Sequence, residues 1–502
     1  MPNMIKAGIL LLLVSGILSS NANLDTIKVD GGSISGTYNE DIHIYKGIPF
    51  AAPPIGDLRW KAPQPVIPWE GTKSCNTFGP SAVQGPPTPF GPWSEEYLIP
   101  KEPISEDCLY LNVWTGAKSP SEKRPVIVYI YGGAFAGGGS ACPVYDGTAM
   151  AKKGLVYVSF NYRVGIFGFM AHPELSAESP AHASGNYGLL DQIAALKWVH
   201  RNIAAFGGDP ENVTIAGQSA GAMSVHCLVA SPLGKGLFKR AIAESGAMFG
   251  KSMTTLKQGE EKGAALGTGI AELRKLSAAA LLQKQWQGRG PIIDTYVLPE
   301  SLSDIFEAGK ENKVDLLTGW NEDDGVDFST ITAADFKADI AGEYGNDAAK
   351  LLSYYKPDSD VDMPGVQTRY SRDLVFGVQN YTWAGVQARR GKVYVYNFTR
   401  KLPATGEYIK YGAFHTGEVA YAYNNLKFVK RCPFEKVDYQ LAEVMSSYWA
   451  NFVKTGDPNG KGLPAWKQYD EKGYATQILG EQVKTERLRT RDVLEILQRH
   501  LY

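Results

Sequence analysis

The sequence lacks an excess of charge of either sign. It contains 51 basic and 52 acidic residues, which give a formal net charge of −1 at pH 7. A chain without a strong overall field has no general attraction for nucleic acid or for an anionic membrane. We therefore expect no nucleic-acid partner, and the substrate need not be charged.

Long apolar runs are also missing from the body of the chain. No stretch after the N-terminal region reaches the roughly 18 uninterrupted apolar residues of a membrane helix, so we predict no membrane span. Residues 1–22 are typical of an export signal peptide, because Lys6 precedes an apolar run from Ala7 to Leu18 and small residues follow it. We expect cleavage and a secreted or periplasmic protein, with an uncleaved anchor as the alternative.

Cysteine is scarce. The five cysteines, at positions 75, 108, 142, 227 and 432, form no C-x-x-C pair. Export would permit disulfides, and the candidate bridge joins Cys75 to Cys108. The alternative is that all five are small buried apolar side chains. No H-E-x-x-H motif or Cys/His cluster occurs, so we predict no metal and no organic cofactor.

Internal repeats and long linkers are absent too, and we interpret residues 23–502 as one catalytic domain. Short apolar runs rich in Val, Ile, Leu and Tyr suit strands that are buried on both faces. Between two of them, Leu190, Ile193, Leu196 and Val199 recur at helical spacing. This alternation predicts an α/β fold with a large, mainly parallel central sheet and helices on both faces. The predicted strands are 109–114, 125–131, 155–160, 213–216, 314–318 and 393–398.

A G-x-S-x-G motif lies between a predicted strand and a predicted helix. It runs from Gly217 to Gly221, with Ser219 at its centre. A serine on a sharp strand-to-helix turn is lifted clear of the sheet, and flanking glycines remove Cβ atoms that would clash there. We predict that Ser219 is a nucleophile.

Acyl transfer also needs donors for the negative oxygen that develops on the substrate. The strand 125–131 ends in Gly132-Gly133-Ala134-Phe135, where small residues let backbone N–H groups approach that oxygen. We predict an oxyanion hole formed by the amides of Gly133, Ala134 and Ala220. An ordinary glycine-rich turn is the alternative.

The base that activates the serine is predicted to be His415. Histidine is the side chain suited to proton transfer near neutral pH, and the chain has only seven. Only His415 lies well beyond the nucleophile motif within the body of the domain, after the strand 393–398. The others are His43, His172, His182, His200, His226 and His500.

A carboxylate must orient this histidine. Asp324 follows the strand 314–318 and precedes a glycine that lets the chain turn. We therefore prefer it, with Glu322 and Asp323 as alternatives. The chain order Ser, Asp, His is that of α/β-hydrolases and not that of chymotrypsin-like or subtilisin-like proteases.

The sequence resembles the type-B carboxylesterase and cholinesterase family over essentially its whole predicted mature length. The resemblance implies an α/β-hydrolase fold and a serine esterase, with the family's catalytic roles on Ser219, Asp324 and His415. The stretches that carry it are Tyr45-Lys46-Gly47-Ile48-Pro49-Phe50-Ala51 with Arg59-Trp60, Glu106-Asp107-Cys108-Leu109-Tyr110-Leu111-Asn112-Val113, Asn161-Tyr162-Arg163, Gly185-Asn186-Tyr187-Gly188-Leu189-Leu190-Asp191-Gln192, and Gly456-Asp457-Pro458-Asn459.

Three positions depart from the family pattern. Gln218 stands where the family usually has Glu, Asp324 replaces the commoner Glu, and Ala134 replaces Gly. The first change removes a carboxylate beside the nucleophile, and the second shortens the reach to His415. The third adds a methyl group that could narrow the acyl side of the pocket.

The expected function is hydrolysis of a small-molecule carboxylic ester through an acyl-enzyme. Aromatic residues near the catalytic positions, namely Trp93, Phe135, Trp320 and Phe414, are candidates for the pocket wall, with plain core packing as the alternative. Other interpretations are an acetyl or feruloyl esterase acting on plant polysaccharide, a non-catalytic adhesion protein of the same fold, and a peptidase or amidase. The sequence does not define the oligomeric state.

Overall fold

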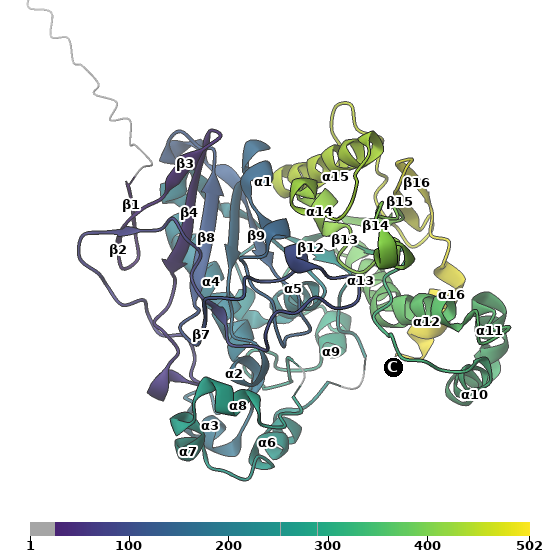
Figure 1. Cartoon of the computed structure of the whole chain (residues 1–502), viewed down its shortest axis with the longest axis horizontal. Coiled ribbons are helices and arrows are strands. Elements are labelled where there is room, and N and C mark those ends of the chain that lie inside the picture. Colours follow the sequence, from purple (N-terminus) through teal and green to yellow (C-terminus); the bar gives the residue numbers. More distant parts are fainter. Residues whose placement is uncertain (1–25, 251–252, 289, 502) are drawn as a thin grey trace, which may run out of the picture.

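A mixed sheet forms the centre of the molecule. The computed structural model describes residues 26–250, 253–288 and 290–501, so the predicted signal peptide, residues 1–22, lies outside the described residues. Within this part the central sheet has eleven strands in the order β16-β15-β14-β13-β12-β11-β9-β10-β8-β4-β3 (Figure 1). Their bounds are β3 Thr37–Asn39, β4 Ile42–Pro49, β8 Tyr110–Thr115, β9 Arg124–Ile130, β10 Val156–Phe160, β11 Gly208–Gln218, β12 Arg240–Glu244, β13 Asp315–Asn321, β14 Val393–Phe398, β15 Ala475–Leu479 and β16 Lys484–Arg487.

The heart of this sheet is parallel and its edges are antiparallel. Strands β10, β9, β11, β12, β13, β14 and β15 pair in parallel, whereas β8, β4, β3 and β16 run against their neighbours. The predicted large, mainly parallel sheet is confirmed. The strand predicted at 109–114 is present as β8, but it belongs to the antiparallel edge. Two smaller sheets combine β1 Thr26–Val29, β2 Gly32–Ser35 and β5 Thr72–Ser74, and β6 Ser81–Ala82 with β7 Ile104–Ser105.

Helices cover both faces of the sheet, as predicted. On one face Trp449 of α15 packs against Tyr396, with ring centroids 5.4 Å apart, and on the other Asn380 of α13 donates to Thr318 of β13. The helices are α1 Thr148–Lys152, α2 Gly165–Phe169, α3 Pro173–Glu178, α4 Tyr187–Asn202, α5 Ala220–Ala230, α6 Leu256–Ala264, α7 Ile270–Lys275, α8 Ala278–Leu282, α9 Leu302–Glu307, α10 Ala333–Tyr344, α11 Ala348–Tyr355, α12 Met363–Arg372, α13 Val378–Ala388, α14 Val419–Ala422, α15 Lys436–Thr455 and α16 Arg491–Arg499.

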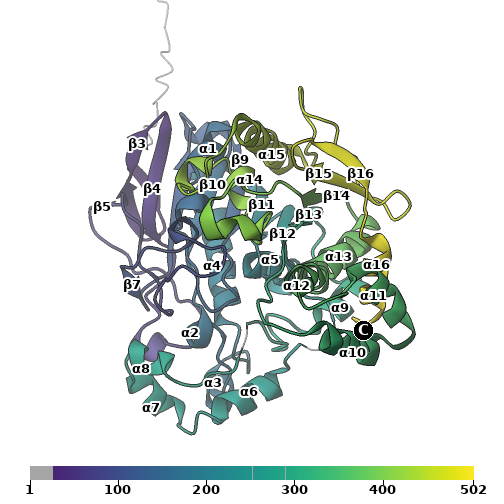
Figure 2. The same cartoon turned by 45° about the vertical axis from the view of Figure 1, so that its right-hand side comes forward.

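The outer helices form two groups at different ends of the molecule. Figures 1 and 2 show α6, α7 and α8 gathered beside α3 at one end, and α10, α11 and α12 gathered near α16 at another. The central strands of the sheet are buried from solvent. Residues Val126 to Val128 and Val156 to Val158 are 0% exposed. Burying one such aliphatic side chain stabilises a fold by about 1.5–3 kcal/mol, so the sheet is a rigid base for the loops at its ends.

The stretches that carry the family resemblance mostly build the frame. Arg163 forms two hydrogen bonds, of 2.8 and 2.7 Å, with the carboxylate of Asp191, and both side chains are buried. Asn112 of β8 accepts a hydrogen bond from the amide of Gly47 in β4. A buried charge is costly unless it is paired, so the Arg163–Asp191 ion pair joins two of these stretches inside the fold.

The predicted disulfide between Cys75 and Cys108 is wrong, because all five cysteines are free and buried. The carbonyl of Cys75 accepts from Lys46, whereas Leu109, beside Cys108, accepts from Phe50. Lys46 and Phe50 lie four residues apart along β4 and its end, which corresponds to about 13 Å. The two cysteines therefore lie beside different parts of β4, and their thiols are not bonded to each other.

Candidate active site

Ser219 occupies the sharp turn between β11 and α5. Its backbone has φ 58° and ψ −126°, which is strained for a residue with a side chain. The flanking glycines are needed because a Cβ at Gly217 would lie 2.5 Å from the backbone of Gly221, and one at Gly221 would lie 2.0 Å from the carbonyl oxygen of Ile130. The turn leaves Ser219 half-buried at the carboxyl end of the sheet, where the sequence placed it.

Three backbone amides near Ser219 donate to no acceptor in the part of the chain that the structure describes. Gly133 and Ala134 are exposed, with φ 119° and 53°, and Ala220 is the first residue of α5. Among the described residues, nothing accepts a hydrogen bond from these three N–H groups. A Cβ at Gly132 would lie 2.9 Å from the Cβ of Ser219, so this loop approaches the serine closely. The arrangement leaves donors ready for a negatively charged oxygen.

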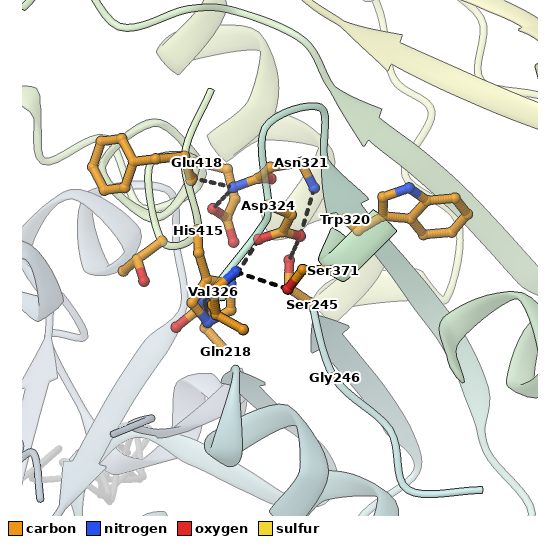
Figure 3. A network of polar contacts seen from close by, with 12 residues as sticks. Gln218, Ser245, Gly246, Trp320, Asn321, Asp324, Val326, Ser371, His415 and Glu418 are labelled. Carbon is orange, nitrogen blue, oxygen red and sulfur yellow. Dashed lines mark hydrogen bonds and ion pairs between the residues drawn. The ribbon is translucent and has the colours of Figure 1, made fainter. Parts of the chain in front are cut away.

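The structure brings Asp324 and His415 together. Oδ1 of Asp324 lies 2.6 Å from Nδ1 of His415, and both side chains are almost completely buried (Figure 3). The other oxygen, Oδ2, accepts hydrogen bonds from the Ser245 hydroxyl at 2.6 Å and from the Asn321 amide at 2.8 Å. With Nδ1 donating to Asp324, Nε2 of His415 is left to accept a proton.

The two alternative carboxylates have other partners. Glu322 pairs with Arg372 at 3.2 Å, and Asp323 accepts a hydrogen bond from the amide of Ala413 at 2.9 Å. Only Asp324 of the acidic loop reaches the histidine, as preferred from the sequence.

The ring of His415 is held on several sides. Phe376 stacks on it at 4.4 Å with an interplanar angle of 10°, and Trp93 stands edge-on at 6.2 Å. The Trp93 indole also donates to the hydroxyl of Thr416 at 3.1 Å. These contacts fix the imidazole orientation without adding a second charge.

Gln218, the residue before Ser219, contacts the ring of His415 through its side chain. The Gln218 amide nitrogen lies 3.2 Å from Nε2 of His415 and 3.4 Å from Nδ1. In the described part of the chain no hydrogen bond joins the Ser219 hydroxyl to His415. Catalytic hydrogen bonds are often long or poorly aligned before substrate binds, so the missing bond does not exclude His415 as the base.

His226, on the helix after the nucleophile, is excluded as the base. It is fully buried against Phe249, Phe306 and Trp383, and burial lowers its pKa to about 3. Its Nδ1 accepts a hydrogen bond from the amide of Met248 at 3.0 Å. It is a neutral core residue.

The predicted pocket residues fall into two classes. Trp93 contacts the catalytic histidine, whereas Phe135 and Phe414 are only 4% exposed and pack against Phe169 and Tyr97. The prediction for Trp320 is wrong: its indole is buried and points away from Asp324 (Figure 3). Side chains alternate along a strand, and since the next residue, Asn321, faces the site, Trp320 faces the other side of β13.

Sequence reasoning missed a buried polar layer behind Asp324. Glu244 accepts hydrogen bonds from the Trp449 indole at 2.8 Å and the Tyr423 hydroxyl at 3.3 Å, and burial raises its pKa to about 8. Burial and the neighbouring Glu244 also raise the pKa of Glu418, which accepts from the Asn321 amide group. Glu244 and Ser245 lie at the end of β12, so recognising that strand would have indicated them.

Comparison with known proteins gives the same answer as the geometry. Residues 23–494 match the carboxylesterase family. The chain is 36% identical over 467 residues to fumonisin B1 esterase of Sphingopyxis macrogoltabida, covering 88% of this chain and 84% of that protein. It is 36% identical over 483 residues to para-nitrobenzyl esterase of Bacillus subtilis, covering 91% and 94%. A solved PNB esterase structure superposes with a TM-score of 0.81 at 31% identity, covering 96% of this chain and 100% of that one. The resemblance noted from the sequence is confirmed: this chain belongs to the carboxylesterase family.

Proposed function

We propose that the protein is a serine carboxylesterase in which Ser219, His415 and Asp324 form the catalytic triad. The observation that carries this is the hydrogen-bonded Asp324–His415 pair near a strained serine, together with three amides that donate to no acceptor among the described residues. The relatives whose names denote esterases support the same reaction.

The first step forms an acyl-enzyme. Ser219 Oγ attacks the ester carbonyl carbon while Nε2 of His415 takes the hydroxyl proton, and the carbonyl oxygen becomes negative beside the amides of Gly133, Ala134 and Ala220. His415 then gives the proton to the alcohol oxygen as the bond from carbon to that oxygen breaks. Asp324 stabilises the positive imidazolium between these two transfers.

The second step consumes water. His415 removes a proton from a water molecule that attacks the acyl carbon, and then returns a proton to Ser219 Oγ as the acid leaves. Gln218 must release Nε2 of His415 in both steps, since that nitrogen carries the proton each time.

An aromatic surface outside the triad supports an ester with a bulky apolar substituent. Trp93 packs against Phe90 at 4.8 Å and Phe328 at 6.2 Å, and these two rings are 61% and 56% exposed. Exposed aromatic rings grouped beside a reactive site are typical of a binding surface. An aromatic acyl group such as feruloyl also fits this surface, so a feruloyl esterase is our second candidate.

The decisive experiment is hydrolysis of a p-nitrophenyl short-chain ester. We expect Ser219→Ala to lower kcat by roughly 10⁴-fold or more, with Ser121→Ala, at an exposed serine, as the matched control. A fluorophosphonate should add one equivalent of mass at Ser219. Full activity in Ser219→Ala would refute the triad and leave a binding-only role, and faster turnover of matched amides than of esters would favour a peptidase.

We also propose an exported enzyme that folds as one domain over residues 23–502. The signal in residues 1–22 supports export, and none of the helices in the described part is both long and apolar enough to cross a membrane. Mass spectrometry of the protein from its native host should find an N-terminus near residue 23. Recovery of the intact chain from the membrane fraction would instead indicate an anchor.

A further inference from the structure

The loop that carries Asp324 packs against one helical segment, residues 363–377. This segment is α12 followed directly by a π-helical turn, Asp373–Gly377, and it belongs to the outer group of α10, α11 and α12 (Figure 2). π-helical turns inside helices are rare and frequently lie at functional sites. None of these residues takes part in the proposed reaction steps, yet the segment contacts both the loop of Asp324 and the ring of His415.

Arg372 holds the loop before the carboxylate. Its Nη1 donates to the carbonyl oxygen of Glu322 at 2.9 Å and lies 3.2 Å from Oε1 of the same residue. Its Nε and Nη2 donate to the two oxygens of Asp373 at 2.8 and 3.0 Å, and both side chains are almost completely buried. A planar guanidinium group that is bonded on two sides has little freedom to turn. Arg372 therefore ties the helical segment to the residue two positions before Asp324.

Ser371 holds the loop after the carboxylate. Its hydroxyl oxygen accepts hydrogen bonds from the amides of Val326 at 3.1 Å (Figure 3) and Asp327 at 3.2 Å. The loop also packs closely on the helix, since a Cβ at Gly325 would lie 2.6 Å from the Cα of Thr368. The backbone on both sides of the catalytic acid is therefore attached to α12.

Phe376 makes the contact on the histidine side. Its buried ring stacks on the imidazole of His415 with the ring centroids 4.4 Å apart and an interplanar angle of 10°. Arg372 and Phe376 are four residues apart, which places their side chains on the same side of one helical turn. A single turn thus contacts the loop of the acid and the ring of the base.

We propose that Arg372 is a positioning residue for the reaction, because it ties the loop of Asp324 to the same turn that supports His415. Without this tie the carboxylate can move away from Nδ1 of His415. The contacts of Asn321 and Asp323 with residues 413–414 would remain, so we expect a partial loss of activity. The proposal rests on the proposed esterase function and adds to it a residue that acts only through the Asp324–His415 pair.

A double variant removes the tie without leaving an unpaired buried charge. In Arg372→Met/Asp373→Asn both members of the ion pair are neutral, and the asparagine oxygen can still accept from the Tyr355 hydroxyl, which lies 3.0 Å from Asp373. We expect kcat for a p-nitrophenyl ester to fall roughly 10- to 100-fold, because small displacements of catalytic groups are costly, with KM almost unchanged.

The acid limb of the pH–rate profile of this double variant should move to lower pH, because a more distant carboxylate stabilises the imidazolium less. The matched control is Arg369→Met, which removes an arginine of the same helix that donates to the carbonyl oxygen of Tyr355 instead. It should change neither kcat nor the profile. Wild-type kcat in the folded double variant would overturn the proposal.

A second background separates positioning from general stability. In an Asp324→Asn protein the pair is already lost, so adding Arg372→Met/Asp373→Asn should lower kcat by no more than about twofold. The same factor in both backgrounds would overturn the proposal, because a residue that only stabilises the fold gives that result. If the double variant does not fold, Ser371→Ala leaves the ion pair intact and should lower kcat a few-fold with the same move of the acid limb. An unchanged acid limb in that variant would count against the proposal.

Proton NMR tests the proposal independently of activity. The proton between Nδ1 of His415 and Oδ1 of Asp324, atoms 2.6 Å apart, should give a far-downfield resonance at low pH in the wild-type protein and in Arg369→Met. In the double variant it should shift upfield or disappear, and an identical resonance would overturn the proposal. If the wild-type protein hydrolyses no ester, the proposed function fails, and this spectrum still decides whether Arg372 holds the pair.

Discussion

The acid–base side and the oxyanion side of the site differ in whether their polar groups already have hydrogen-bond partners. On the acid–base side both oxygens of Asp324 are bonded, to His415, Ser245 and Asn321, and the whole group is buried. On the oxyanion side the amides of Gly133 and Ala134 are exposed and donate to nothing described.

This difference has a physical reason, which is where the charge that each side stabilises comes from during the reaction. The imidazolium forms inside the protein, so its counter-charge has to be fixed in advance by neighbouring donors. The oxyanion arrives with the substrate, and amides already bonded within the protein could not stabilise it without breaking those bonds. We expect mutations on the two sides to have distinguishable signatures, and four predictions test this, from the largest expected effect to the smallest.

Asp324→Asn should have the largest effect, lowering kcat by roughly 10³–10⁴-fold, because an amide can hold His415 in the wrong tautomer and cannot stabilise its positive form. Steady-state kinetics with a p-nitrophenyl ester would measure it, with little change in KM. Asp327→Asn removes a charge from the same loop at an exposed position and is the control. A loss below tenfold in Asp324→Asn would remove the carboxylate from the proposed triad.

Gly132→Ala should lower kcat by roughly 10²–10³-fold, the effect of disturbing an oxyanion donor. The new methyl group would lie 2.7 Å from the carbonyl oxygen of Gln218, so the loop that carries Gly133 must shift away from Ser219. Fluorophosphonate labelling should slow in parallel, and Gly342→Ala, where the Cβ meets nothing within 4 Å, is the control. Wild-type kcat in a folded Gly132→Ala protein would show that this loop does not form the oxyanion hole.

Ser245→Ala should have a smaller effect, roughly tenfold on kcat, because it removes one hydrogen bond from Asp324 and leaves that of Asn321. Since the change acts through the Asp324–His415 pair, the acid limb of the pH–rate profile should move as well. Ser245→Thr, which keeps the hydroxyl, should recover most of the rate. An unchanged pH profile would mean that Ser245 only fills space.

The smallest effect concerns stability and the layer behind Asp324. The pKa of Glu244 is raised to about 8 by burial, from 4.5, so between these values the folded state binds more protons than the unfolded state. The free energy of unfolding should therefore fall as pH rises through this window, by at most about 1.4 kcal/mol per pH unit for this group. Urea denaturation between pH 5 and 8 would measure the slope, and Glu244→Gln should flatten it. A variant with the wild-type slope would assign the dependence to other groups, of which Glu418 is the nearest.

Most of the frame and the reacting residues could be predicted from the sequence. The apolar runs gave the buried strands because burial on both faces leaves an uninterrupted apolar pattern, and the ends of those strands indicated Ser219, Asp324 and Gly133. Strand β12 was not predicted, because its five residues begin with Arg240 and end with Glu244 and so carry too weak an apolar pattern. The supporting Ser245 was missed with it.

Long-range packing could not be predicted in the same way. Phe376 stacks on His415 from a helical segment whose sequence gives no sign of a catalytic neighbour. The orientation of Trp320 depends on which face of β13 turns to the site, and the continuous apolar pattern of a doubly buried strand does not reveal it. The disulfide was predicted incorrectly for a similar reason, because the positions of Cys75 and Cys108 in the sequence do not show how far apart they lie around β4.

Because all five cysteines are buried, the rate at which their thiols react with a reagent reports how fast the protein unfolds around them. Burial raises the pKa of Cys75 to about 11 and that of Cys142 to about 12, so neither thiol is ionised at neutral pH, and both are shielded from solvent. A thiol-reactive dye should therefore label the folded enzyme only as fast as the molecule unfolds locally or globally. The time course of labelling would report the rates at which different layers of the fold come apart, without any engineered probe.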